Sequence, residues 1–274
     1  EVVRTHAPRW TSIESHWLVP CGLVVGTVAR SHAHRAFAHS GDVALLERIA
    51  GGRNLARVIA RSGAELVFVS DDLRQRFARL CGDRHDLSAV DTSVQALPID
   101  DIFRPPSQQT RADLRRRFGL TAPTVIAVGR LVPIKGFDVL VRAVARIPAQ
   151  HRPLVVIAGD GPGAAQLRLL SSRLQVDLRL LGAIERLEVA AWLGAADVYV
   201  HPSRVVGART EGMPLAVREA LAVGLPVIAS NAGGLTELAR TSPRVTLVQP
   251  DDAAALSAKL ASQCYAQVRS APHA

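Results

Sequence analysis

The sequence predicts an α/β protein built from two Rossmann-like, doubly wound domains. Its 274 residues are enough for two compact units of about 100–150 residues each. A hydrophobic fraction of 48% beside 21% charged residues is typical of globular chains and excludes wholesale disorder. In the second half, short apolar runs alternate with segments of helical spacing, which indicates a parallel sheet covered by helices on both faces.

The clearest boundary is the stretch Ile99–Thr110, where a proline pair and polar residues interrupt every periodic pattern. We interpret it as a linker and expect one domain over 1–104 and another over 105–274. In the second domain the expected strands are 124–130, 153–161, 177–183, 197–203, 225–231 and 244–250. The expected helices between and after them are 136–147, 163–175, 186–196, 214–223, 234–240 and 251–263.

The first domain shows the same alternation with fewer elements. Its expected strands are 11–18, 34–40, 65–70 and 93–100, and its expected helices are 21–31, 43–63 and 71–80. Ser70 is a suitable N-cap for the last helix. The strands are too few for a complete doubly wound sheet, and Met213 is the only methionine. We therefore expect this N-terminal domain to be incomplete, with further residues ahead of Glu1.

The net charge of +9 favours phosphate-bearing partners such as a diphosphate substrate or an anionic membrane surface. Only Lys135 and Lys259 are lysines among the 33 basic residues, so the excess is a general use of arginine. No aromatic stacking platform accompanies it, which argues against dedicated nucleic-acid binding. The densest basic run, Arg111–Arg117, is interpreted as the solvated face of a short helix.

Several other classes are excluded by simple patterns. No apolar run reaches the roughly 18 residues that a membrane-spanning helix needs. The charged opening residues lack the apolar core of a signal peptide. The three cysteines lack the spacing of a metal site or a disulfide framework, which favours a reducing, cytoplasmic location.

Arg130 and Lys135 follow the first expected strand of the second domain. Ligands of open parallel sheets bind beyond the carboxyl ends of the strands. Arginine offers a planar fork of donors to a phosphate and lysine a compact charge. A pair of surface cations is the alternative interpretation. The strand-end position and the rarity of lysine in this chain favour the phosphate site.

The segment Glu211–Glu219 is the most informative. Pro214 suits the first turn of a helix and Gly224 its end, so Glu211 and Gly212 should lie at a helix N-terminus, where free N–H groups favour an anion. Simple helix capping is the alternative for Glu211. Glu219 follows about two turns later, and two acids on one helix would suit two sets of sugar hydroxyls.

These motifs together resemble a known family. The stretches VGRLVPIKGFDVLVRAV, VIAGDGP, LLGAI, DVYVHPS, EGMPLAVREALAVGLPVIAS and NAGGLTEL are similar to the C-terminal domain of the family 4 retaining glycosyltransferases. The resemblance covers residues 123–260 in detail. A looser resemblance covers 12–104 through SIESHWLVPCG, AHSGDVALL and LVFVSDDLRQRF. It implies the GT-B fold, in which two Rossmann-like domains flank the active site.

The resemblance also implies residue roles. Arg130 and Lys135 would bind the donor diphosphate, Glu219 the ribose hydroxyls, and Glu211 the transferred sugar. The remaining implied positions are Gly212, Met213, Pro214 and Leu215 at the distal phosphate, Ile184 near the base and His16 beside the sugar. The expected substrate is a UDP- or GDP-sugar, and the acceptor is unspecified. No cofactor or metal is expected, since the cations neutralise the diphosphate.

The implied chemistry is glycosyl transfer with retention, in which the leaving phosphate takes the acceptor's proton. Fixed cations and a helix N-terminus would stabilise the charge on the leaving group. Departures from the family pattern lie on the acceptor side: Glu14 replaces a histidine, and Pro98-Ile99-Asp100-Asp101 lacks a glycine. Two alternatives stay open, an inactive nucleotide-sugar-binding remnant and a nucleotide-sugar epimerase of the same fold.

Overall fold

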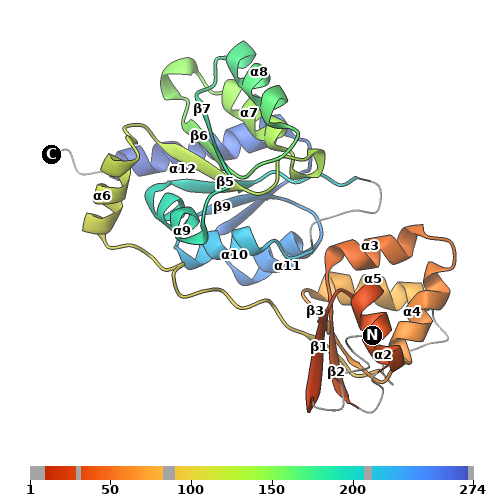
Figure 1. Ribbon diagram of the computed structural model, residues 1–274. Helices are drawn as coiled ribbons and strands as arrows, with labels where there is room; N and C mark the ends of the chain where they lie inside the picture. Colours follow the sequence, from red (N-terminus) through yellow and green to blue (C-terminus); the bar gives the residue numbers. More distant parts are fainter. Residues whose placement is uncertain (1–9, 29–31, 83–89, 207–211, 271–274) are drawn as a thin grey trace. The chain divides into compact units, whose positions relative to one another are not determined.

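Two parallel sheets organise the chain, as Figure 1 shows. The computed structural model describes residues 10–28, 32–82, 90–206 and 212–270, with side chains as far as residue 264. The chain divides into two compact units. The first comprises Glu1–Leu97 with Val206–Met213, and the second comprises Pro98–Val205 with Pro214–Ala274.

The first unit is built on a four-stranded parallel sheet in the order β1-β2-β3-β4. Its strands are β1 (Ser12–His16), β2 (Ala33–Ala38), β3 (Glu65–Phe68) and β4 (Thr92–Val94). Its helical segments are η2 (Leu18–Gly22), α2 (Leu23–Val28), α3 (Ser40–Arg48), α4 (Gly52–Ala60) and α5 (Asp71–Cys81). All four predicted strands are present, and Leu66, Phe68 and Phe77 are fully buried in the core.

The single helix predicted over 43–63 is wrong, because the chain breaks into α3 and α4 at a glycine pair. Gly51 has a left-handed φ of 79°, which glycine adopts without steric cost. A Cβ at Gly52 would lie 1.9 Å from the carbonyl oxygen of Leu46, so the turn needs glycine there too. The predicted cap of α5 is confirmed, since the backbone N–H of Leu73 donates to Ser70 Oγ at 3.3 Å.

The second unit contains a six-stranded parallel sheet in the order β10-β9-β8-β5-β6-β7. Its strands are β5 (Thr124–Val128), β6 (Leu154–Ala158), β7 (Leu178–Gly182), β8 (Val198–His201), β9 (Val227–Ser230) and β10 (Val245–Val248). Each of them falls within a predicted strand. The central position of β5 and β8 places the ends of these two strands side by side.

Helices cover this sheet on both faces, as the apolar strands predicted. They are α6 (Gln108–Arg117), η4 (Pro133–Lys135), α7 (Phe137–Ala145), η5 (Ala149–His151), α8 (Ala164–Leu174), α9 (Arg186–Ala195), α10 (Leu215–Ala222), α11 (Gly234–Thr241) and α12 (Ala253–Ser270). Neighbouring residues of β8 belong to opposite cores: Val200 packs in the core that contains Leu140 and Leu256, and Tyr199 in the one that contains Trp192 and Val217.

The predicted linker Ile99–Thr110 is wrong in its middle. Phe103 is buried in the core of the second unit, and the predicted division at 104/105 differs from the change of unit after Leu97.

The basic run is also less solvated than predicted: Arg111 and Arg115 of α6 both bond the carboxylate of Asp197, at 2.6 and 3.0 Å. Within the described part of the chain, no helix has the length and apolarity to cross a membrane.

Candidate functional site

The two predicted phosphate residues lie on the turn after β5. Lys135 ends η4, and its side chain runs over Gly129: a Cβ at Gly129 would lie 3.3 Å from Lys135 Cε. Gly129 has a φ of 151°, a conformation that favours glycine. Arg130 is exposed, whereas Lys135 is half-buried. The structure therefore places both cations at one strand end, while their role stays a prediction.

His201 is a buried histidine that shares this edge of the sheet. It ends β8, its Nδ1 lies 3.4 Å from the hydroxyl of Tyr199, and its Nε2 has no hydrogen-bond partner within the described ranges. Burial first, and the charge of Lys135 second, lower the pKa of His201 to about 3. The imidazole is therefore neutral near pH 7 and does not place a second positive charge beside Lys135.

Glu219 is a buried carboxylate on α10, only 6% exposed. Arg186, the first residue of α9, contacts its Oε1 at 3.3 Å. Burial raises the pKa of Glu219, the positive charge of Arg186 opposes that rise, and Asp100 adds to it. Ile184 precedes α9 by two positions and packs against the core of the second unit that contains Trp192 and Val217. The ion pair between Arg186 and Glu219 therefore links the start of α9, close to Ile184 in the chain, to α10.

The segment before α10 contains several predicted site residues. Glu211 lies outside the described residues. Gly212 and Met213 group with the first unit: a Cβ at Gly212 would lie 3.0 Å from the Cβ of Ser40, and Met213 packs against that unit's core. Pro214 is the N-cap of α10 and Leu215 its first residue. Because proline carries no capping oxygen, its side chain leaves the first N–H groups of α10 to other partners.

In the first unit, His16 ends β1 and stands beside a second histidine. Its ring stacks on Phe37 with centroids 4.7 Å apart, and its Nδ1 lies 3.3 Å from Nε2 of His39. Burial, and then His16, lower the pKa of His39. Sequence reasoning assigned no role to His39. The proximity of the two histidines could have been predicted, because His16 and His39 lie at the carboxyl ends of neighbouring parallel strands.

Asp42 holds the two turns that carry these histidines. Its carboxylate is fully buried and accepts the backbone N–H of Leu18 at 2.6 Å, and those of His39 and Val43 at 2.9 Å each. Burial raises the pKa of Asp42 to about 6, although these hydrogen bonds oppose the rise. The turn after β1 and the turn after β2 are thereby fixed to one carboxylate.

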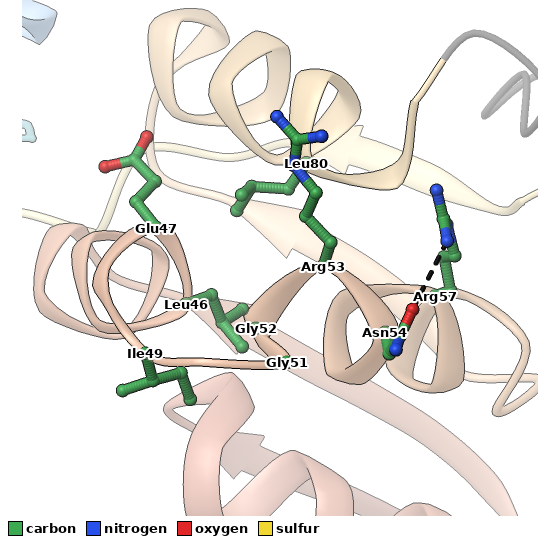
Figure 2. A pocket seen from close by; sticks show the side chains of 9 residues that line it. All are labelled: Leu46, Glu47, Ile49, Gly51, Gly52, Arg53, Asn54, Arg57 and Leu80. Atoms are coloured by element: carbon green, nitrogen blue, oxygen red, sulfur yellow. Dashed lines mark hydrogen bonds between the residues drawn. The ribbon is translucent and has the colours of Figure 1, made fainter.

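A separate pocket of about 620 Å³ lies in the first unit between α3, α4 and α5 (Figure 2). The pocket combines apolar side chains such as Leu46 and Leu80 with Arg53 and Arg57. The guanidinium of Arg57 donates to the side-chain oxygen of Asn54 at 3.3 Å, the bond drawn in Figure 2. The residues that line it do not include the predicted site residues, so this pocket is not the predicted donor site.

The second unit coincides with a family match. The model described as "Glycosyl transferases group 1" matches residues 110–264, which include β5 to β10 and both Lys135 and Glu219. The chain belongs to the group 1 glycosyltransferases. The resemblance to glycosyltransferases is therefore confirmed for the part of the chain in which it was most detailed.

Curated relatives of this group 1 chain are glycosyltransferases by name. The GDP-mannose-dependent alpha-(1-6)-phosphatidylinositol monomannoside mannosyltransferase of Mycobacterium tuberculosis is 37% identical over 191 residues, covering 68% of this chain and 48% of the relative. The D-inositol 3-phosphate glycosyltransferase of Xylanimonas cellulosilytica is 32% identical over 267 residues, covering 92% of this chain and 60% of the relative. The chain spans 48% and 60% of the length of these two relatives.

Solved structures share the fold of this group 1 chain. HepE of Anabaena, solved with UDP and glucose, superposes with a TM-score of 0.77 at 22% identity, covering 98% of this chain and 72% of HepE. Sucrose-phosphate synthase of Thermosynechococcus elongatus gives 0.74 at 23% identity, covering 97% of this chain and 66% of the synthase. The predicted GT-B fold with two Rossmann-like domains is thereby confirmed.

Proposed function

We propose that this chain carries out retaining glycosyl transfer of the family 4 type, from a UDP- or GDP-sugar to an acceptor hydroxyl. Its membership of the group 1 glycosyltransferases supports the reaction class. The M. tuberculosis relative is named as dependent on GDP-mannose, and HepE is titled as a complex with UDP and glucose, which supports a nucleotide-sugar donor.

One observation carries the proposal. Lys135 lies over Gly129 at the end of β5, next to the neutral His201 at the end of β8. The unit that the family model matches therefore holds a cation at the edge where parallel sheets bind ligands. A leaving diphosphate gains negative charge during glycosyl transfer, and a fixed ammonium lowers the energy of that charge separation.

The remaining roles follow the family pattern and belong to the same proposal. Arg130 and Lys135 bind the diphosphate, and the buried Glu219 accepts hydrogen bonds from the ribose. The other contacts are assigned to Ile184 at the base, to Gly212, Met213, Pro214 and Leu215 at the distal phosphate, and to Glu211 and His16 at the transferred sugar. The reaction retains the anomeric configuration by front-face attack, and the leaving phosphate accepts the proton of the acceptor hydroxyl.

We also place the reaction in the cytoplasm, at the inner face of an anionic membrane. The net charge of +9 supports attraction to such a surface, and the M. tuberculosis relative is named as a phosphatidylinositol monomannoside mannosyltransferase. Sedimentation with vesicles tests the membrane contact. The chain should pellet with phosphatidylglycerol vesicles at low salt, and equal pelleting with neutral phosphatidylcholine vesicles would contradict it.

Calorimetric titration of the 274-residue chain with UDP and GDP in the presence of EDTA tests the donor site. We expect one of the two to bind without added metal and to bind more weakly as salt rises, because the contacts are ionic. The matched nucleosides uridine and guanosine serve as controls without the diphosphate. Failure of both diphosphates to bind, or an absolute need for a divalent ion, would overturn the proposal.

A further inference from the structure

Arg204 makes several hydrogen bonds next to the candidate diphosphate site. Its guanidinium donates to both carboxylate oxygens of Asp138, at 2.7 Å each, and through Nε to Asp251 at 2.5 Å. It also reaches the carbonyl oxygen of Pro133 at 3.3 Å, and its own backbone N–H donates to the carbonyl of Ile134 at 2.8 Å. These contacts join the end of β8 to the turn after β5.

The backbone just before and just after Lys135 contacts the segment that ends in Arg204. Pro133 and Ile134 are the two preceding residues of η4, and both of their carbonyls are held by Arg204. On the other side of Lys135, a Cβ at Gly136 would lie 1.9 Å from the carbonyl oxygen of Pro202. The backbone on both sides of Lys135 is therefore packed directly on the segment that ends in Arg204.

The charges explain why Arg204 is not itself a phosphate ligand. Its side chain is 24% exposed, and its guanidinium lies between two carboxylates, Asp138 in the first turn of α7 and Asp251 after β10. The hydrogen bonds to Asp138 raise the pKa of Arg204 further above the ordinary arginine value, so the guanidinium is charged at every working pH. A planar fork is the geometry that a bidentate carboxylate contact needs, and lysine cannot reproduce it.

We propose that Arg204 is a positioning residue for Lys135, which holds the η4 turn so that the ammonium faces the donor diphosphate. This inference rests on the proposed function, because it assumes that Lys135 binds the diphosphate. It adds a residue to which neither the sequence patterns nor the comparisons assign a role. It also predicts that the effect of Arg204 on ligand binding depends on the side chain of Lys135.

A double-mutant cycle with Arg204→Met and Lys135→Ala tests this dependence, with affinity for UDP, GDP and their nucleosides as the readout. Arg204→Met should weaken diphosphate binding on the order of tenfold and leave nucleoside binding unchanged, as expected for residues that share one network. In the Lys135→Ala background, the same substitution should change diphosphate affinity by less than about twofold.

Arg142→Met is the matched control. Arg142 also approaches Asp138, at 3.9 Å, but its side chain is 57% exposed and it bonds no part of η4 among the described contacts. Its removal should leave diphosphate affinity within about twofold of the unchanged chain. Arg204→Lys provides a second variant, which keeps the charge but loses the fork, and it should show the same selective loss of diphosphate affinity.

The outcomes separate the two proposals. If Lys135→Ala leaves diphosphate affinity unchanged, the proposed donor site is wrong. If Lys135→Ala weakens binding but Arg204→Met and Arg204→Lys do not, only the positioning role is overturned. The positioning role is also overturned if the Arg204 variants weaken nucleosides and diphosphates equally, or if their effect is the same with and without Lys135.

Discussion

Glu219→Gln separates ligand binding from structural support at the proposed ribose site. The substitution keeps the shape of a side chain that is 6% exposed and removes its charge. A hydrogen bond to a charged group contributes about 1.5–3 kcal/mol, so nucleoside, nucleoside diphosphate and nucleotide-sugar should all bind roughly ten- to a hundredfold more weakly. The common loss is expected because all three ligands carry the ribose.

The stability of the folded chain should change little in the same variant. Arg186, the partner of Glu219, is 56% exposed, and such pairs contribute at most about 1 kcal/mol. Burial already raises the pKa of Glu219, which means that the charged form is held at a cost. A neutral glutamine removes both the ion pair and this cost, and the two effects oppose each other.

Calorimetric titration and urea unfolding of the same preparations measure the two quantities. Glu188→Gln, a partly exposed carboxylate on α9, is the control for the loss of one negative charge. The reasoning is refuted if Glu219→Gln lowers the free energy of unfolding but leaves the affinity for every ligand unchanged. It is equally refuted if Glu188→Gln weakens the ligands as much as Glu219→Gln does.

Three further predictions concern the other charged groups. Lys135→Ala and Arg130→Ala should each weaken nucleoside diphosphate far more than nucleoside in calorimetry, and equal losses would contradict the phosphate assignment. Glu211→Gln should leave nucleoside diphosphate affinity nearly unchanged and weaken the intact nucleotide-sugar, and identical effects on both would contradict a sugar contact. Burial raises the pKa of Asp42 from 3.8 to about 6, so the folded chain binds this proton more tightly than the unfolded chain. Lowering the pH from about 7 to about 4 should therefore add about 2 kcal/mol to the free energy of unfolding through this group, and Asp42→Asn should abolish that gain in urea titrations; an unchanged pH dependence would contradict it.

The sheet of the second unit was predictable because strands that are buried on both faces have continuous apolar sequences. The break between α3 and α4 was not, since the Gly51–Gly52 pair lies inside a segment with helical spacing. The glycine pair is itself a local signal of a turn, but the helical spacing around it dominated the prediction. Phe103 was missed for a different reason, because its burial depends on residues far away in the sequence.

Sequence motifs identify Lys135 and Glu219 directly as candidate site residues, and their roles stay predictions. Residues that act by holding other residues were not predictable. Arg204 bonds Asp138 and Asp251, which lie 66 and 47 positions away in the chain. Asp42 bonds the backbone of Leu18, 24 positions away. Their importance follows from contacts that only the folded chain brings together.

Other arginine side chains join backbone segments in a similar way. Arg152 donates to four backbone carbonyls, those of Ala145, Ile147, Leu174 and Gln175. A guanidinium has five N–H donors in a fixed plane, which suits it to several carbonyl or carboxylate oxygens at once. An ammonium on a flexible stem is a compact point charge. Lys135 lies in the narrow space over Gly129, where a Cβ would come within 3.3 Å of its Cε, and there the compact group fits. The space over Gly129 therefore suits the lysine at this position, whereas Arg152 joins several backbone segments together.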